Sequence, residues 1–194
     1  MNDSELIKIT AKNANIVCQQ LELEEEAKQL LNPEASPSDY LRLLIEKNQY
    51  PDAIRFLAMA LPRRESVWWA CVCARGSVSG QTKPQLVAAL TAAEAWVYQP
   101  TEENRRNAMA LAEATEFAGS GSWAAVAAFW SGGSISPPEA PVVPPPEDLT
   151  AKAVAGAVML AAAELDPEKI EDSYKKLLAK GIDIAKGGKG EIAQ

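Results

Sequence analysis

The sequence contains no histidine among its 194 residues. A chain without histidine cannot form a Ser–His–Asp triad, a Cys–His pair, a zinc site with histidine ligands or the di-iron centre that some helical bundles build with two histidines. Any acid–base catalysis would have to use carboxylates or lysines. This absence leads us to expect a protein that is not an enzyme and holds no metal ion.

Glycine-rich nucleotide-binding motifs and the nucleophile motif of α/β-hydrolases are also missing. The segment GGKG at 187–190 follows no strand pattern and opens no helix, so it is not a phosphate loop. Glu94, Glu113 and Glu116 lie in alanine-rich segments, and the last two would share one face of a helix. Because such carboxylates usually solvate a surface, we expect no cofactor and no catalytic residue.

Long apolar runs are absent as well. The longest covers residues 153–163, whereas a membrane-spanning helix needs about 20 apolar residues. The start of the chain has no basic region followed by an apolar run, so no signal peptide is visible. The net charge of −7 disfavours nucleic acid and anionic membrane surfaces as partners. Together these features predict a soluble, cytoplasmic protein with no nucleic-acid partner and no membrane insertion.

Cysteine is scarce and odd in number. The three cysteines are Cys18, Cys71 and Cys73. Residues two apart on a helix point away from each other, so Cys71 and Cys73 cannot grip one metal ion together. Free cysteine behaves as a small hydrophobic residue, and we expect all three thiols to be reduced and buried.

Helix signals, in contrast, recur at short intervals along the chain. Pro51, Pro62 and Pro84 fit the first turns of helices, and Thr101 fits an N-cap followed by acidic residues. No alternating strand pattern competes with them. The sequence predicts an all-α fold, a compact array or irregular bundle of about eight to ten short helices in one domain, residues 1–194.

Several boundaries follow from local residue types. Ser38 and Thr150 are expected to cap the helices that follow them, since serine and threonine are favoured N-caps. The segment GSGS at 119–122 is expected to be a turn between two helices, because glycine and serine interrupt helical patterns. Residues 186–194, which are rich in glycine and lysine, are predicted to form a flexible tail.

A glycine- and proline-rich segment, residues 131–147, precedes the last two predicted helices. Its six prolines between 137 and 146 enforce an extended, polyproline-like path. A ligand for an SH3-type domain is disfavoured, since no arginine or lysine stands beside the prolines. We predict a rigid strap laid over the helices, with Val142 and Val143 pointing inward.

The segment LPRRESVWWACVCARG, residues 61–76, is apolar nearly all round between its arginines. Such a helix is typical of a core, so Trp68 and Trp69 are interpreted mainly as core residues. The arginines at its ends, Arg63, Arg64 and Arg75, have two interpretations. They could pair with Glu65 or with the acidic segment 21–27, or they could bind carboxylates of a partner protein.

Three blocks of the chain resemble an uncharacterised bacterial family, a domain of unknown function. The blocks are the helix just described, the turn FWSGGS at 129–134, and the proline strap with the alanine-rich helix after it. That family is associated with type VI secretion gene clusters. The resemblance implies an accessory, adaptor or chaperone-like protein with no active site, and it singles out Arg63, Arg64, Glu65, Trp68, Trp69, Phe129, Trp130, Ser131, Gly132 and Gly133.

The most direct functional hypothesis is a non-catalytic cytoplasmic protein-interaction module of a bacterial secretion system. Its candidate partner-binding residues are Arg63, Arg64, Glu65, Trp68, Arg75 and Trp130. A second hypothesis is an anion-binding protein or enzyme, with Arg63, Arg64 or Arg75 as a clamp and Glu65 or Glu113 as the acid–base group. Trp68 or Trp130 and the strap would roof that pocket, and the turn at 131–134 could offer N–H donors. A structural subunit of a larger assembly is a third hypothesis.

Overall fold

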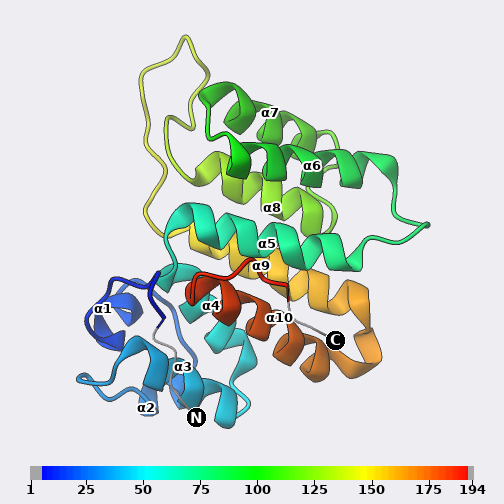
Figure 1. The fold of residues 1–194 in the computed structure, drawn as a ribbon. Coiled ribbons are helices and arrows are strands. Elements are labelled where there is room, and N and C mark those ends of the chain that lie inside the picture. The colour runs from blue at the N-terminus through cyan, green and yellow to red at the C-terminus, as the bar shows by residue number, and fades with distance from the viewer. Residues whose placement is uncertain (1–5, 192–194) are drawn as a thin grey trace.

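The computed structural model describes residues 6–191, and all of its regular structure is helical (Figure 1). This confirms the all-α array of about eight to ten short helices. Within residues 6–191 there is no strand. The elements are α1 (Ala14–Cys18), α2 (Glu25–Gln29), α3 (Pro37–Glu46), α4 (Tyr50–Ala60), α5 (Arg63–Ser77), α6 (Pro84–Tyr98), α7 (Glu102–Glu113), α8 (Gly119–Trp130), α9 (Leu149–Leu165), the 3₁₀ helix η1 (Pro167–Lys169) and α10 (Ile170–Ala185).

Helices α5, α8 and α9 form the centre of the bundle. Helices α6 and α7 cover α8 on one side, and α4 and α10 cover α5 and α9 on the other (Figure 1). Both α8 and α9 are rich in buried alanine, and small side chains let two helices approach closely. The fully buried alanines of these two helices are Ala124, Ala125, Ala127, Ala128, Ala153, Ala157, Ala161 and Ala162.

Helix α5 is the central core helix that its composition predicts. Trp69, Cys71 and Cys73 are completely buried. The indole nitrogen of Trp69 donates a hydrogen bond to the carbonyl oxygen of Leu177 on α10 at 2.9 Å. This bond satisfies the one polar atom of the largest core side chain, so α10 is held to α5 by both packing and a directed contact.

Three local predictions are wrong, each for a physical reason. Ser36 rather than Ser38 caps α3, because its side chain accepts the N–H of Asp39 while Pro37 occupies the first turn. Thr150 lies inside α9 and donates its hydroxyl to the carbonyl of Trp130 at 2.9 Å. The segment GSGS is the first turn of α8. There, a Cβ on Gly121 would stand 3.0 Å from Leu90 of α6, so the missing side chain lets the helices meet.

The strap also differs from its prediction. It projects beyond the helices rather than lying over them (Figure 1), and Val142 and Val143 are 79% and 45% exposed. The segment closes on itself, since the N–H of Ile135 donates to the carbonyl of Val143 at 2.8 Å. Closure leaves no helix beneath the two valines. Pro145, nearer to α9, is the strap proline that is buried.

Residues 186–191 of the expected tail are folded back on the bundle. The carboxylate of Asp183 accepts the N–H of Gly190 at 2.8 Å, and the carbonyl of Lys189 accepts the indole N–H of Trp68 at 3.1 Å. Gly190 is buried. The remaining tail residues, 192–194, lie outside the described residues. None of the described helices combines the length and apolar character that crossing a bilayer requires.

The contact between α10 and α5 depends on a missing side chain at Gly181. A Cβ there would stand 2.6 Å from Trp69 and 2.7 Å from Leu57, which is too close for either side chain to remain in place. We predict that Gly181→Ala lowers the free energy of unfolding by about 1–3 kcal/mol through overpacking. Gly156→Ala on α9 is the matched control, since nothing lies within 4 Å of its added Cβ.

Gly156→Ala should raise stability by up to about 1 kcal/mol, because alanine is the better helix former. Urea unfolding followed by tryptophan fluorescence measures both values. If the two substitutions change the free energy of unfolding equally, the close contact of Gly181 with Trp69 and Leu57 does not contribute to stability.

Candidate functional site

The first turn of α5 brings three of the expected site residues together at one end of the bundle. Arg63 and Arg64 are exposed and Glu65 is partly exposed, while Trp68 follows one turn later on the face of Arg64. Arg75 stands twelve positions after Arg63, about 18 Å further along the helix axis. Arg75 therefore belongs to the opposite end of α5 and not to this group.

Arg64 joins the start of α5 to the end of α6. Its Nε donates to the carbonyl of Val97 at 2.6 Å, and its Nη2 donates to the carbonyl of Tyr98 at 3.4 Å. The last carbonyls of a helix have no partner within the helix and carry the negative end of its dipole. A guanidinium placed here satisfies those carbonyls without losing its charge.

Arg63 binds the backbone at the root of the strap. Its Nη1 donates to the carbonyl of Ser131 at 3.1 Å, directly after α8. The same side chain lines a hollow of about 300 Å³ together with Gln20, Glu147 and Thr150. The arginine thus lies between the strap and the segment that leads into α2.

The expected ion pairs of Arg63 and Arg64 with Glu65 or with segment 21–27 are wrong. Glu65 pairs instead with Lys8 at 3.2 Å. Within residues 6–191, no carboxylate lies in ion-pair distance of either arginine, because both guanidinium groups bind backbone carbonyls. All other arginines of the chain contact a carboxylate: Arg42, Arg55, Arg75, Arg105 and Arg106.

An aromatic pair lies beside Arg64. The rings of Trp68 and Tyr98 meet edge to face, with centroids 5.7 Å apart and planes at 63°. Tyr98 is 72% exposed, and Lys189 follows the same surface because its carbonyl holds the indole of Trp68. We call Arg64, Trp68, Tyr98 and Lys189 the Trp68–Tyr98 surface. It combines the exposed ring of Tyr98 and the partly exposed ring of Trp68 with the charges of Arg64 and of the exposed Lys189, whose backbone lies against Trp68.

Tyr98 and Lys189 were not among the site residues expected from the sequence. Tyr98 falls outside the buried stripe of α6, which ends at Val97, and an exposed aromatic at a helix terminus is the signal that could have found it. Lys189 had no such signal, since its position depends on the way residues after α10 fold back. Trp130, in contrast, packs on Trp123 with ring centroids 6.4 Å apart, and its carbonyl accepts from Thr150.

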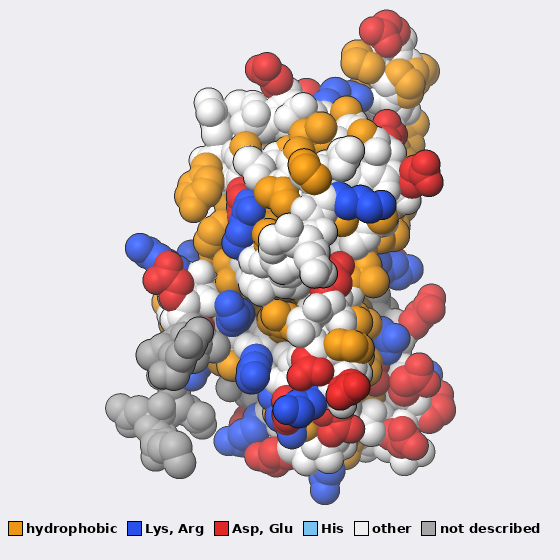
Figure 2. All heavy atoms as spheres, turned by 90° about the vertical axis from the view of Figure 1, so that its right-hand side faces the viewer, with side chains coloured by type: hydrophobic (Ala, Val, Ile, Leu, Met, Phe, Trp, Pro, Cys, Tyr) orange, Lys and Arg blue, Asp and Glu red, His pale blue; other side chains and the backbone are white. Residues whose placement is uncertain are grey.

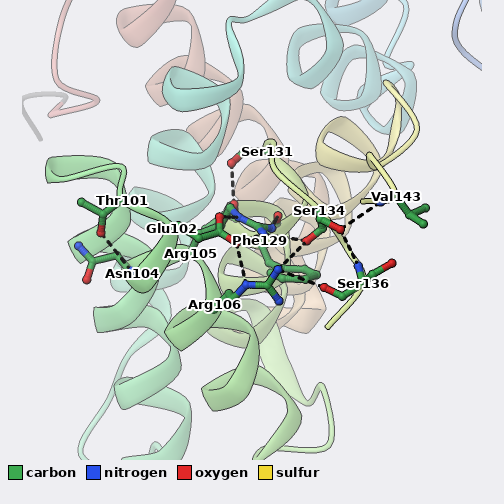
Figure 3. A network of polar contacts seen from close by, with 11 residues as sticks. Thr101, Glu102, Asn104, Arg105, Arg106, Phe129, Ser131, Ser134, Ser136 and Val143 are labelled. Atoms are coloured by element: carbon green, nitrogen blue, oxygen red, sulfur yellow. Dashed lines mark hydrogen bonds and ion pairs between the residues drawn. The ribbon is translucent and has the colours of Figure 1, made fainter. Parts of the chain in front are cut away.

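The strap is fixed at its root by Arg105 of α7, which is only 4% exposed (Figure 3). Its Nη1 donates to the carbonyl of Phe129 at 2.5 Å, and its Nη2 donates to the carbonyl of Ser134 at 2.8 Å. The guanidinium also lies over the ring of Phe129, 4.4 Å from the centroid. Glu102 neutralises it with bonds of 2.6 and 2.7 Å. The hydrogen bond from Arg105 is the main reason that the pKa of Glu102 is lowered.

Gly133 lets the backbone of the strap pass directly over the guanidinium of Arg105. Its φ of +64° is accessible mainly to glycine, and a Cβ there would stand 2.9 Å from Arg105. Arg106 adds bonds to the carbonyls of Ser134 and Ser136. The turn at 131–134 therefore presents carbonyl oxygens to three arginines, Arg63, Arg105 and Arg106, in place of the N–H donors that an anion site would need.

The residues of the expected anion pocket are not gathered around one cavity. Arg75 forms a two-pronged contact with Glu94, at 2.9 and 2.5 Å, and this hydrogen bonding raises the pKa of Arg75. Glu113 ends α7, whereas Arg105 near the start of that helix is the part that contacts the strap. The hollow beside Arg63 contains none of Glu65, Arg75 or Trp130.

A second hollow, of about 760 Å³, lies where α5 ends and α6 begins; Figure 2 views the molecule from this side. The carboxylate of Glu164 lines this hollow and accepts three hydrogen bonds. Two come from the hydroxyl groups of Ser77 and Ser120, and the third comes from the backbone N–H of Ser120 at 2.8 Å. Since no side chain of its own caps α8, Glu164 satisfies that helix start and has a structural explanation.

The cysteines show no sign of reactivity. Cys71 and Cys73 are fully buried, and burial raises the pKa of both thiols. Burial likewise raises the pKa of Cys18 to about 11. Thiols that stay protonated are poor nucleophiles. Across residues 6–191, no group of three cysteine or acidic side chains is arranged to hold a metal ion.

We predict that Arg105→Ala lowers the free energy of unfolding by about 2–4 kcal/mol, because the carbonyls of Phe129 and Ser134 lose their donor. Amide exchange at Ile135 and Val143 should accelerate as the strap root loosens. Arg106→Ala is the comparison and should cost about 1 kcal/mol or less, since Arg106 is more exposed and its bonds to Ser134 and Ser136 are longer than those of Arg105 to Phe129 and Ser134. Unchanged amide exchange in Arg105→Ala would show that the strap holds its position without Arg105.

The comparisons with known proteins give one result. No curated protein and no solved structure matches the chain. A model of a family of unknown function, DUF6931, matches residues 40–185, from α3 to the end of α10. The match includes α5, the strap and Tyr98, and it covers most of the sequence. The chain therefore belongs to the DUF6931 family.

Proposed function

We propose that the protein is a non-catalytic protein-interaction module, and that its Trp68–Tyr98 surface binds an acidic, partly apolar segment of a partner protein. The observation that carries this proposal is the difference between the arginines in their binding partners, which are backbone carbonyls for Arg63 and Arg64 and carboxylates for the others. Among residues 6–191, no carboxylate lies within ion-pair distance of Arg63 or Arg64, whereas each of the other five arginines contacts a carboxylate.

The surface contains the residue types that contribute most to binding energy at protein–protein interfaces. Arginine, tryptophan and tyrosine are the residues whose truncation most often weakens a protein complex. Tyr98 offers an exposed ring whose position is fixed by Trp68, so little side-chain freedom would be lost on binding. In a chain with net charge −7, local positive charge would select acidic segments and speed their approach.

An anion-binding protein or enzyme has weaker support. Arg75, one of its expected clamps, is fully engaged by Glu94, and the turn at 131–134 directs carbonyl oxygens at Arg105 and Arg106. The resemblance to a family associated with type VI secretion favours an adaptor or accessory role in the bacterial cytoplasm. We therefore propose a secretion-related protein as the partner, and a structural subunit remains the related alternative.

The test is affinity purification of the tagged full-length protein from its native cells, followed by mass spectrometry. We expect one protein with an acidic segment to be captured by the wild type. The capture should be lost with Tyr98→Ala and with Arg63→Glu/Arg64→Glu. Binding of the purified partner should weaken by at least about tenfold in each variant, as expected for central contact residues.

Lys83→Glu is the matched control, because it reverses one exposed charge at the opposite end of α6, about 22 Å from Tyr98. Thermal unfolding checks that every variant is folded, which matters for Arg64 since it caps α6. Equal capture by the wild type and both surface variants would refute the proposal. A thermal-shift response to phosphates, nucleotides or carboxylates, lost on changing Arg63, would favour the anion-binding alternative.

A further inference from the structure

The chain itself carries a segment whose chemistry suits the Trp68–Tyr98 surface. This segment is the strap tip, residues 137–142, with the sequence PPEAPV. Its prolines and Val142 are exposed. Glu139 is the one charged residue between Ser131 and Pro146. The strap tip is thus an apolar, proline-rich projection with a single negative charge.

The strap tip is held in a defined shape. A turn closes it, with the N–H of Ala140 donating to the carbonyl of Pro137 at 3.0 Å. Below the turn, the N–H of Val143 donates to the hydroxyl of Ser134 at 3.1 Å, and Arg105 holds the root. Figures 1 and 2 both show it extending beyond the helices, with apolar and acidic side chains at its end in Figure 2. An ordered projection loses little conformational freedom when it docks.

The Trp68–Tyr98 surface has the features that recognise such a segment. Aromatic rings accept the flat, apolar faces of proline rings, and the turn at the strap tip leaves the rings of Pro137, Pro138 and Pro141 exposed. The edge-to-face pair of Trp68 and Tyr98 offers these rings. Arg64, whose guanidinium binds the carbonyls of Val97 and Tyr98, and the exposed Lys189, whose backbone binds Trp68, carry the charge opposite to that of Glu139.

The two complementary parts do not meet within one molecule. Among residues 6–191, no hydrogen bond, ion pair or ring contact joins the strap tip to the Trp68–Tyr98 surface. The strap rises from the same side of the molecule as the start of α5, but its tip points away from the helices (Figure 1). A two-fold axis beside this side would bring each strap tip to the other copy, and such isologous pairing closes a dimer.

We propose that the Trp68–Tyr98 surface receives the strap tip of a second copy of this chain, so that two copies exchange their strap tips in a symmetric dimer. The inference rests on the proposed function of the surface: the strap tip of a second copy occupies the surface while no secretion-related partner is bound, and the two compete for it. Glu139 of each copy pairs with Arg64 and Lys189 of the other copy, and the prolines lie on Trp68 and Tyr98.

Sedimentation velocity of the full-length protein over a range of concentrations tests this dimer. The wild type should show a monomer–dimer equilibrium that weakens with added salt. Glu139→Lys, Tyr98→Ala and Arg64→Glu/Lys189→Glu should each raise the dissociation constant by at least about tenfold. Lys83→Glu should leave it unchanged. Glu139 and Tyr98 are exposed, so their substitutions are compatible with folding.

Mixing two variants gives the sharper test. Glu139→Lys and Arg64→Glu/Lys189→Glu, each monomeric alone, should form a mixed dimer near wild-type strength. In that mixture the reversed strap tip meets the reversed surface, and the unchanged strap tip meets the unchanged surface. Only exchange between two chains predicts this rescue.

A wild type that stays monomeric over the range tested would overturn the inference. A mixture of the two variants that stays monomeric would do the same, and so would a wild type that forms open chains instead of closed dimers. These failures are distinguishable from failure of the proposed function. If the wild type is monomeric but still captures another protein through Tyr98, the surface binds a different protein. If it neither dimerises nor captures a protein, both proposals are refuted.

Discussion

The buried guanidinium of Arg105 is the contact on which one end of the molecule depends. It joins α7, Phe129 of α8 and the turn at 133–134, and no other side chain in the described region forms hydrogen bonds that join all three. A charge this deeply buried is tolerable because Glu102, two carbonyls and the ring of Phe129 surround it. The strap inherits its direction from this arrangement, since Gly133 can pass over the guanidinium only without a side chain.

The neighbouring surface follows from a different use of arginine. Arg63 and Arg64 donate hydrogen bonds to backbone carbonyl oxygens, which carry a partial charge and no net charge. Each contact therefore holds the side chain in place but does not neutralise the positive charge of its guanidinium. Arg75 at the far end of α5 has Glu94, and its charge is cancelled locally. One helix therefore carries a structural arginine at its end and two functional candidates at its start. The charge of Arg64 is also favourable at the C-terminus of α6, where it meets the negative end of the helix dipole.

Much of the fold could be predicted because its signals are local. Prolines at helix starts and the continuous apolar composition of residues 61–76 predicted the array and its central helix, and both are confirmed. The errors concern contacts between distant segments. Val142 and Val143 would suit a core by composition, but closure through Ile135 lifts them away from it. Arg63 and Arg64 were placed in the candidate site from sequence, while Tyr98 and Lys189 joined it through tertiary packing that no local pattern encodes.

The burial of every cysteine has a practical consequence. Cys18, Cys71 and Cys73 account for all thiols of the chain, and each is shielded within the bundle. A cysteine engineered into the strap would be the one readily accessible thiol, and maleimide dyes would label that position selectively without prior removal of the native residues. Because the native thiols stay unlabelled, fluorescence or spin-label spectroscopy would report only on the engineered position. The movement of a single chosen segment can then be followed.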